Sequence, residues 1–117
     1  MLVNLNDHEI IVSDGELQIV YPRSRKPVRM EQREDTVCNI DGIPIVQMVY
    51  ECDAGLLPEK REGVYYIVPK IVRDLHAGKR DDLVSPGTNP GVDGAIIGKG
   101  KIKCVRRFRL PDRMVVK

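Results

Sequence analysis

Aromatic side chains are scarce in this chain of 117 residues, which contains no tryptophan, one phenylalanine and four tyrosines. A hydrophobic core therefore has to be built from isoleucine, valine, leucine and methionine. No apolar run approaches the roughly 18 residues that indicate a membrane-spanning helix. The first ten residues also lack the basic and apolar regions of a signal peptide. We therefore expect a cytoplasmic protein with no membrane partner.

Cysteine is sparse as well, with Cys38, Cys52 and Cys104 widely separated. An odd number without a Cys-x-x-Cys pair argues against both a disulfide framework and a zinc site. We predict three reduced cysteines, with one reactive thiol as the alternative.

Catalytic motifs are missing too. The chain contains neither GxxxxGK[ST] nor GxSxG, and Gly-Lys-Gly-Lys at 98–101 lacks the context of a phosphate-binding loop. No partner for acid–base work is evident beside His8 or His76, so structural roles are favoured for both. Asp81 and Asp82 are adjacent and point in different directions in extended chain, which makes them a weak acid–base pair and a weak Mg²⁺ site. We predict a non-enzymatic protein without metal or cofactor.

Charge is unevenly distributed along the chain. Residues 99–117 carry eight basic residues and one acidic residue, whereas residues 1–98 carry 11 basic and 16 acidic residues. This asymmetry predicts an anionic partner for the basic segment: a nucleic acid, a nucleotide or the acidic body of a sister subunit. From this segment we select four candidate ligand-binding residues, namely Arg106, Arg107, Arg109 and Arg113.

Two Asp-Gly pairs, at 14–15 and 41–42, separate β-branched runs and predict two β-hairpins. Residues 43–50 are apolar on both alternating faces except at Gln47, which predicts a central strand buried on both sides. The polar stretch 53–63 is predicted to be a connector.

A helix is predicted over residues 69–77. Pro69 suits a first helical turn, Ile71, Val72 and Leu75 share one face, and Gly78 is placed to cap the end. Together these patterns predict one α+β domain over 1–117. Its sheet should be mostly antiparallel, built from hairpins and open or barrel-like.

Basic residues also gather in the segment 22–29, which contains two prolines. Its candidate anion-binding residues are Arg23, Arg25, Lys26 and Arg29, and the alternative is a solvated connector. Tyr65 and Tyr66 are adjacent and would face opposite sides of a strand, so one can fill the core while the other stacks on a base. The alternative is that both tyrosines only fill the core or the surface.

The stretch Ser-Pro-Gly-Thr-Asn-Pro-Gly-Val-Asp-Gly at 85–94 is incompatible with a helix or a regular strand. A compact domain seldom keeps so long a loop without a function, so we expect residues 79–94 to form one wall of a binding site. Ser85, Thr88 and Asn89 would supply hydrogen bonds. Lys70, a cation at a helix start, would contact the same anion. A rigid connector is the alternative.

Residues 96–109 predict one or two strands broken by glycines, with Lys101, Lys103, Arg107 and Arg109 on one face. Such a face can follow the phosphates of a nucleic acid. It can equally protect an edge strand against aggregation.

Five segments occur in an order that resembles a family of small phage and prophage proteins. They are Asn-Leu-x-x-His-x-Ile at 4–10, DGIPIV at 41–46, EGVYYIVPKIV at 62–72, RDDLVSPG at 80–87 and DGAIIG at 93–98. The resemblance covers residues 1–98. The basic segment from Lys99 extends beyond the pattern, and Pro69 stands where a small residue such as serine is commoner in the family.

The resemblance implies a viral accessory protein in a bacterial host cell. Small viral proteins there often inhibit host enzymes or sequester host signals, and bacterial immune signals are frequently nucleotides. We therefore expect a homo-oligomeric anti-defence protein that sequesters a nucleotide. The alternatives are a nucleic-acid-binding module that uses the basic segment and a protein inhibitor of a host enzyme.

Overall fold

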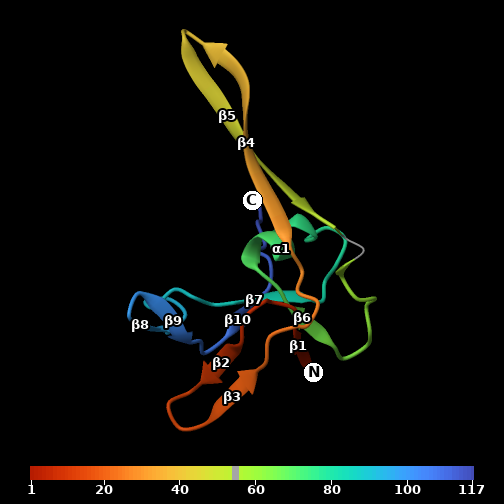
Figure 1. Cartoon of the computed structure of the whole chain (residues 1–117), viewed down its shortest axis with the longest axis vertical. Helices are drawn as coiled ribbons and strands as arrows, with labels where there is room; N and C mark the ends of the chain where they lie inside the picture. The colour runs from red at the N-terminus through yellow and green to blue at the C-terminus, as the bar shows by residue number, and fades with distance from the viewer. Residues whose placement is uncertain (54–55) are drawn as a thin grey trace.

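The computed structural model describes residues 1–53 and 56–117, which form ten β-strands and one short α-helix (Figure 1). The helix is α1 (Lys70–Leu75). The strands are β1 (Leu2–Asn4), β2 (Ile10–Ser13), β3 (Gln18–Tyr21), β4 (Met30–Ile40), β5 (Ile43–Cys52), β6 (Tyr65–Ile67), β7 (Leu83–Pro86), β8 (Ile96–Gly98), β9 (Lys101–Cys104) and β10 (Phe108–Arg109).

Three antiparallel hairpins, β2–β3, β4–β5 and β8–β9, confirm the predicted mostly antiparallel α+β fold. The turns at Asp41-Gly42 and Lys99-Gly100 have positive φ at both central residues, 53° and 76° in the first, 53° and 75° in the second. This backbone geometry matches the twist of tight hairpins and favours glycine at the second position. Among the described residues the sheets stay open and do not close into a barrel.

A four-stranded sheet with the order β1-β6-β7-β10 forms the centre of the molecule. β1 runs parallel to β6, and β6 runs parallel to β7, with α1 making the crossover between them. β10 closes the other edge in antiparallel orientation. The sequence analysis did not predict these two parallel pairs.

Alternating side chains of the central sheet supply two separate cores, because successive residues of a strand face opposite sides. One core contains Tyr66, Leu83 and Val72 of α1. The other contains Ile67 and Val84, which pack against residues from β2 and from the segments around β8 and β9. The β2–β3 and β8–β9 hairpins are therefore attached to the body through the second core, whereas Met30 and Cys52 at the base of β4–β5 pack against the first.

Two sequence predictions about local structure need correction. The helix spans 70–75 rather than 69–77, and it ends at His76, whose Nδ1 lies 2.9 Å from the Val72 carbonyl oxygen, rather than at Gly78. Ser85 and Pro86 also belong to strand β7 instead of an irregular loop. Proline is tolerated there because the pairing of β7 with β6 ends at Val84, so the missing N–H of Pro86 costs no hydrogen bond to β6.

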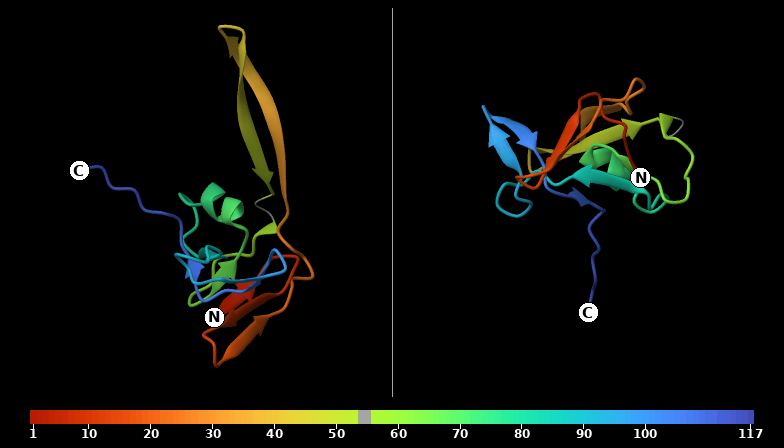
Figure 2. Two further views of the ribbon diagram at one scale, coloured as in Figure 1. Left: turned by 90° about the vertical axis from the view of Figure 1, so that its left-hand side faces the viewer. Right: turned by 90° about the horizontal axis from the view of Figure 1, so that it is seen from below.

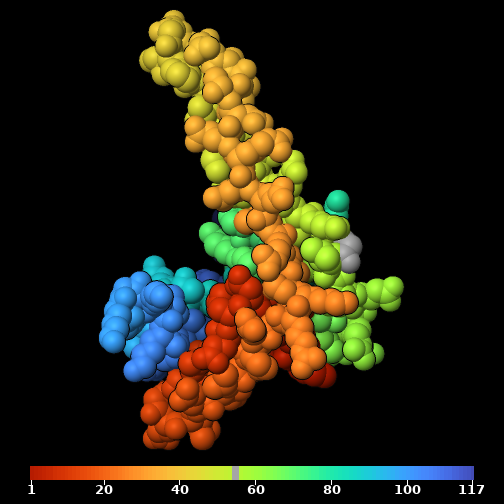
Figure 3. Space-filling model, viewed as in Figure 1, coloured from red at the N-terminus to blue at the C-terminus, as the bar shows by residue number. Residues whose placement is uncertain are grey.

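The β4–β5 hairpin projects far from the body, as Figures 1 and 3 show. The prediction that residues 43–50 are buried on both sides was wrong, since Ile43 to Met48 are all exposed. The radius of gyration is 16.8 Å, whereas a compact chain of this length would have about 13 Å. Of the connector predicted over 53–63, positions 54 and 55 lie outside the described residues.

The last residues, 110–117, form no regular structure and extend away from the body (Figure 2). In the described parts of the chain, no helix has the length and apolar character needed to cross a bilayer.

Candidate ligand-binding groove

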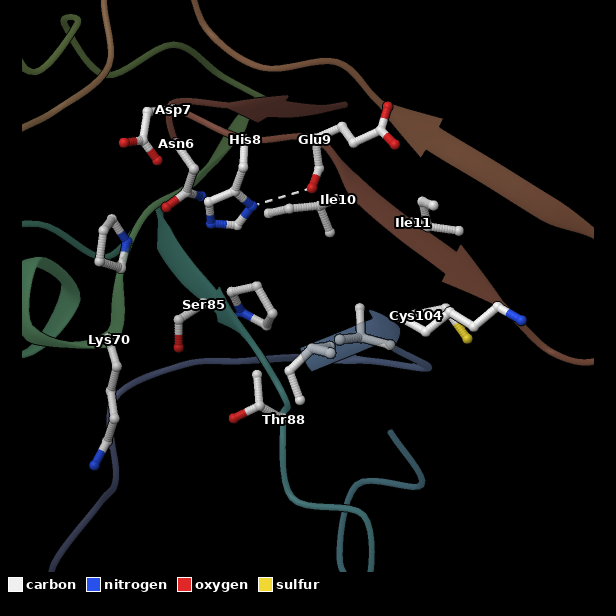
Figure 4. Close-up of a pocket in the computed structure, with 15 residues that line it drawn as sticks. Asn6, Asp7, His8, Glu9, Ile10, Ile11, Lys70, Ser85, Thr88 and Cys104 are labelled. Atoms are coloured by element: carbon white, nitrogen blue, oxygen red, sulfur yellow. Dashed lines mark hydrogen bonds between the residues drawn. The ribbon is translucent and has the colours of Figure 1, made fainter. Parts of the chain in front are cut away.

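A cavity of about 470 Å³ lies where three strands of the central sheet end. Because β1, β6 and β7 are parallel, their carboxyl ends meet at one edge. The cavity is lined there by residues 6–9 after β1, by Pro69 and Lys70 after β6, and by Pro86 and Thr88 from the end of β7 (Figure 4). Ligands commonly bind outside the carboxyl ends of parallel strands.

The opposite wall of this cavity is mostly apolar and includes one cation, Lys103. Ile10 and Ile11 come from β2, and Ile102, Cys104 and Val105 come from β9 and the residue after it. β2 is fixed beside Val105, whose N–H donates to the Ile11 carbonyl at 2.8 Å. The cavity therefore joins an apolar wall to a polar edge, which is the usual composition of a small-molecule site.

Two buried amides hold the turn that follows β1. The Asn4 Nδ2 group lies within 3.2 Å of the carbonyl oxygens of His8, Tyr21 and Pro22. Asn4 Oδ1 accepts hydrogen bonds from the backbone and side-chain amides of Asn6, and Asn6 Nδ2 donates to the Ile67 carbonyl. These bonds tie the ends of β1, β3 and β6 together and so position the cavity wall.

His8 is exposed, and its ring lies at the cavity (Figure 4). Its Nδ1 lies 3.1 Å from the Glu9 carbonyl oxygen. Asp7 and Glu9 are exposed residues of the same wall, and in Figure 4 the Glu9 carboxylate points away from the cavity. The Asp7 carboxylate can accept hydrogen bonds from hydroxyl groups of a ligand.

A second cavity of about 300 Å³ shares Lys70, Ser85, Pro86 and Thr88 with the first. The two cavities therefore adjoin at these residues and together form the candidate groove. The second cavity is more polar, and its remaining lining residues are Arg73, Asn89, Val92, Asp93, Arg109 and Asp112. The groove thus has an apolar arm and a polar, arginine-containing arm that meet at Lys70, Ser85 and Thr88.

The loop after β7 folds around the buried carboxylate of Asp93. Its Oδ1 accepts hydrogen bonds from Arg107 Nε at 2.8 Å and Arg109 Nε at 2.6 Å, and its Oδ2 accepts one from the Asn89 N–H at 3.1 Å. Burial by itself raises the pKa of Asp93, but these hydrogen bonds outweigh it and hold the pKa below the ordinary value. Gly87 packs directly on this carboxylate.

Arg73 of α1 is buried beneath the polar arm, with 2% of its side chain exposed. It donates two hydrogen bonds to Asp74, at 2.9 and 2.7 Å, and one to Ser85 Oγ at 3.0 Å. A longer bond of 3.4 Å reaches the Arg109 carbonyl oxygen. The guanidinium therefore joins α1, β7 and β10 and gives the groove a rigid floor.

The structure brings together five of the residues that the sequence analysis selected, since Lys70, Ser85, Thr88, Asn89 and Arg109 all line the groove. Within this set, Ser85 is bound to Arg73, and Arg109 to Asp93. The side chains of Lys70 and Thr88 are exposed at the junction of the two arms and are the more available to a ligand.

Other selected residues lie outside the lining of this groove. Arg107 pairs with Asp93, and the Arg106 side chain packs against Gly94. Tyr66 is in the core, where its hydroxyl donates to the Glu59 carbonyl at 3.3 Å, while Tyr65 is half-exposed beside β1. The remaining members of the set are exposed on the β3–β4 connector or in the C-terminal segment, namely Arg23, Arg25, Lys26, Arg29 and Arg113.

Sequence reasoning missed most of the apolar arm and the hydrogen bonds by which Asn4 and Asn6 hold the turn after β1. Asn4, His8 and Ile10 belong to the Asn-Leu-x-x-His-x-Ile segment at 4–10, which served for the family resemblance and, at His8, was considered only for acid–base work. That segment could have pointed to this wall. The contributions of Ile102 and Val105 depend on the packing of distant segments and had no sequence signal.

Among the described residues, no group of three His, Cys, Asp or Glu side chains is arranged to hold a metal ion. The two adjacent acidic residues within the 79–94 segment are each paired with a cation: Asp81 with Lys60, and Asp82 with Arg80 at 2.8 Å. Hydrogen bonds from these partners lower the pKa of both carboxyl groups. All three cysteines are free, and burial raises the pKa of the Cys52 thiol.

Comparison with known proteins gave no match: no family model fits the chain, and neither a curated protein nor a solved structure is similar to it.

Proposed function

We propose that the protein binds an anionic nucleotide in this groove without converting it. The observation that carries the proposal is the meeting of an apolar arm and a polar arm at Lys70, Ser85 and Thr88. A nucleotide has the same division, with a flat, weakly polar base at one end and charged phosphate at the other. The volume of the first cavity, about 470 Å³, falls within the range of small-molecule sites.

Each part of a nucleotide has a suitable surface in the groove. The base would lie in the apolar arm, against Ile10 and Ile102. Asp7 would accept hydrogen bonds from ribose hydroxyls. The phosphate would contact Lys70, whose flexible ammonium carries no ion pair among the described residues, and the hydroxyl of Thr88.

Binding without turnover is supported by the state of the one serine in the groove. Ser85 is buried, and its Oγ accepts a hydrogen bond from Arg73. An activated nucleophile would instead donate its proton to a neighbouring base. Together with the resemblance to small phage proteins, this supports sequestration of a nucleotide signal of the bacterial host as the biological role.

Nucleic-acid binding through the basic segment is the alternative, and exposed lysines on β8–β9 favour it. Two of the arginines that it would use, Arg107 and Arg109, already neutralise Asp93. Fewer cations are then left to follow a phosphate backbone, so nucleotide binding is the better supported function.

Two measurements test the proposal. In native mass spectrometry of protein purified from a bacterial host, we expect an added mass of nucleotide size that is lost on denaturation. In calorimetry with ADP as the probe, Lys70→Glu should weaken binding about tenfold or more, because a hydrogen bond to a charged group contributes about 1.5–3 kcal/mol.

Lys79→Glu is the matched control, since it makes the same charge change at an exposed position outside the groove lining. It should bind ADP as the unmodified chain does, and chromatography should recover the ADP unchanged. A protein that carries no added mass and fails to bind ADP would contradict the proposal, as would equal effects of the two substitutions.

A further inference from the structure

Asn6 is a buried polar residue in the lining of the first cavity, with 5% of its surface exposed. A chain of hydrogen bonds that starts at the backbone fixes which end of its amide faces the cavity. Three backbone carbonyl oxygens surround Asn4 Nδ2, and the Asn6 backbone N–H donates to Asn4 Oδ1. Because carbonyl oxygens only accept and backbone N–H groups only donate, the orientation of the Asn4 amide is settled.

The orientation of the Asn6 amide follows from that of Asn4. Asn6 Nδ2 donates to Asn4 Oδ1 at 3.0 Å and to the Ile67 carbonyl oxygen at 3.2 Å. An amide nitrogen carries two hydrogens, so both are used. Asn6 Oδ1 is then the free end of the side chain, and among the described residues nothing donates to it.

This oxygen is open to the cavity. No enclosed side-chain oxygen or nitrogen lacks a hydrogen-bond partner in the described part of the chain, so an oxygen without a partner has to be accessible from outside. Figure 4 shows the Asn6 oxygen pointing into the space that Lys70 and Ser85 also border. Asn6 thus presents a fixed hydrogen-bond acceptor to whatever fills the cavity.

His8 places a second acceptor on the same wall. Its Nδ1 lies 3.1 Å from the Glu9 carbonyl oxygen, which can only accept, so Nδ1 carries the proton. In the neutral ring Nε2 then has a lone pair and no hydrogen. In Figure 4 this second nitrogen is turned away from Glu9 and toward Asn6 and the cavity.

The side chains of Asn6 and His8 therefore ask the ligand for hydrogen-bond donors. A ligand that displaces water from a buried acceptor has to supply a donor, because an acceptor left unpaired is costly. On a nucleotide base, the exocyclic amino group offers two donor hydrogens. Adenine, guanine and cytosine carry this group, whereas hypoxanthine and uracil have a carbonyl oxygen in its place.

We propose that Asn6 and His8 make the groove selective for a base with an exocyclic amino group over its deaminated counterpart. This inference rests on the proposed nucleotide function and adds to it the group of the base that is recognised. The amine donates one hydrogen to Asn6 Oδ1 and the other to His8 Nε2. A carbonyl oxygen in the same place would face two acceptors and be repelled.

Calorimetry with matched pairs of ligands tests this selectivity. ADP and IDP differ by the exchange of an amine for a carbonyl oxygen, and CDP and UDP differ in the same way. We expect the amino member of each pair to bind about tenfold or more tightly, because a site built to hydrogen-bond an N–H rejects the analogue that lacks it. Adenine and hypoxanthine repeat the comparison without phosphate.

His8→Phe tests the second acceptor, since it keeps a flat ring and removes Nε2. His8 is exposed, so the fold should tolerate the change, and the preference for ADP over IDP should fall about threefold or more. Gln18→Phe is the matched control, because it adds the same ring at an exposed position outside the groove lining. It should keep the full preference, and circular dichroism should show both variants folded.

The possible outcomes separate this inference from the proposed function. Equal affinities within both nucleotide pairs would overturn the inference and leave nucleotide binding in place. Adenine bound in preference to hypoxanthine, without any binding of ADP, would support the inference and contradict the site given to the phosphate. Failure of all these compounds to bind would overturn both. A His8→Phe chain with the full preference would overturn the role of His8.

Discussion

The carboxylate of Asp93 explains how a loop rich in glycine and proline keeps one shape. It accepts hydrogen bonds from two arginine side chains and one backbone amide. Asn89 orders the same turn by accepting hydrogen bonds from the amides of Gly91 and Val92, at 2.9 and 3.1 Å. The loop is therefore held by polar side chains rather than by a strand ladder, and it can support the groove.

Acid should loosen this loop. The folded-state pKa of Asp93 lies below the ordinary 3.8, so its stabilising contribution is complete above the unfolded pKa and is lost as the pH falls through the folded pKa. We expect Asp93→Asn to lower the urea midpoint at about pH 6 and to reduce the further loss at about pH 3. Asp112→Asn, an exposed control, should change neither; identical curves for both variants would refute the role of Asp93.

Sequence patterns predicted the local elements well, because a hairpin is specified by neighbouring residues. The Asp-Gly turns at 14–15 and 41–42 occur where they were expected, and α1 differs from its predicted span by a few residues. The pairing of β1 with β6 had no such signal, since it joins Leu2 to Tyr65 across a long separation.

The strand from Ile43 onward was misjudged for a related reason. Apolar residues on both faces of a strand predict that other residues cover it. The pattern does not show whether those residues belong to the same chain. Within one copy these residues are exposed, so the inference from pattern to burial inside one domain failed.

The candidate groove was partly predictable. Ser85, Thr88 and Asn89 were selected because polar side chains, glycine and proline crowd one segment, and Lys70 because it is a cation at the start of the predicted helix. All four line the groove. The hydrogen bonds of the Asn4 side chain were not predictable, because its partners include the carbonyl oxygens of residues 21 and 22, which only the folded chain brings close.

The loop that follows β7 should be sensitive to a single methyl group. A Cβ at Gly87 would lie 2.7 Å from the Asp93 side-chain carbon, which two arginines hold in place. We expect Gly87→Ala to destabilise the fold by about 1–3 kcal/mol through overpacking and to weaken ADP binding.

Gly78→Ala is the matched control for this loop, because an added Cβ there meets nothing within 4 Å and the backbone φ is not positive. Urea unfolding should place it close to the unmodified chain. Equal midpoints for the two alanine variants would show that Gly87 has room to accept a side chain.

At the scale of the whole molecule, the body and the β4–β5 hairpin divide the chain into a packed part and a projecting part. Only the base of the hairpin reaches the core, where Met30 and Cys52 pack against it. The body should therefore fold without the outer hairpin.

Removing the outer hairpin tests this division. We expect a chain in which an Asn-Gly turn replaces residues 34–48 to unfold cooperatively, with a stability within about 1 kcal/mol of the full chain, because exposed residues contribute little. The comparison is made by urea unfolding at concentrations where the full chain is monomeric. Loss of cooperative unfolding in the trimmed chain would show that the hairpin supports the body.

The order of strands in the central sheet has a consequence for biosynthesis. Each hairpin can close as soon as it leaves the ribosome, because its strands are adjacent in sequence. The sheet itself joins β1 to β6 and β7 to β10, so it is complete only after residue 109 has emerged. Contacts of such long separation form slowly. The nascent chain would therefore expose its early apolar hairpins before it has a core, which makes the period of synthesis the stage at which it most needs a chaperone.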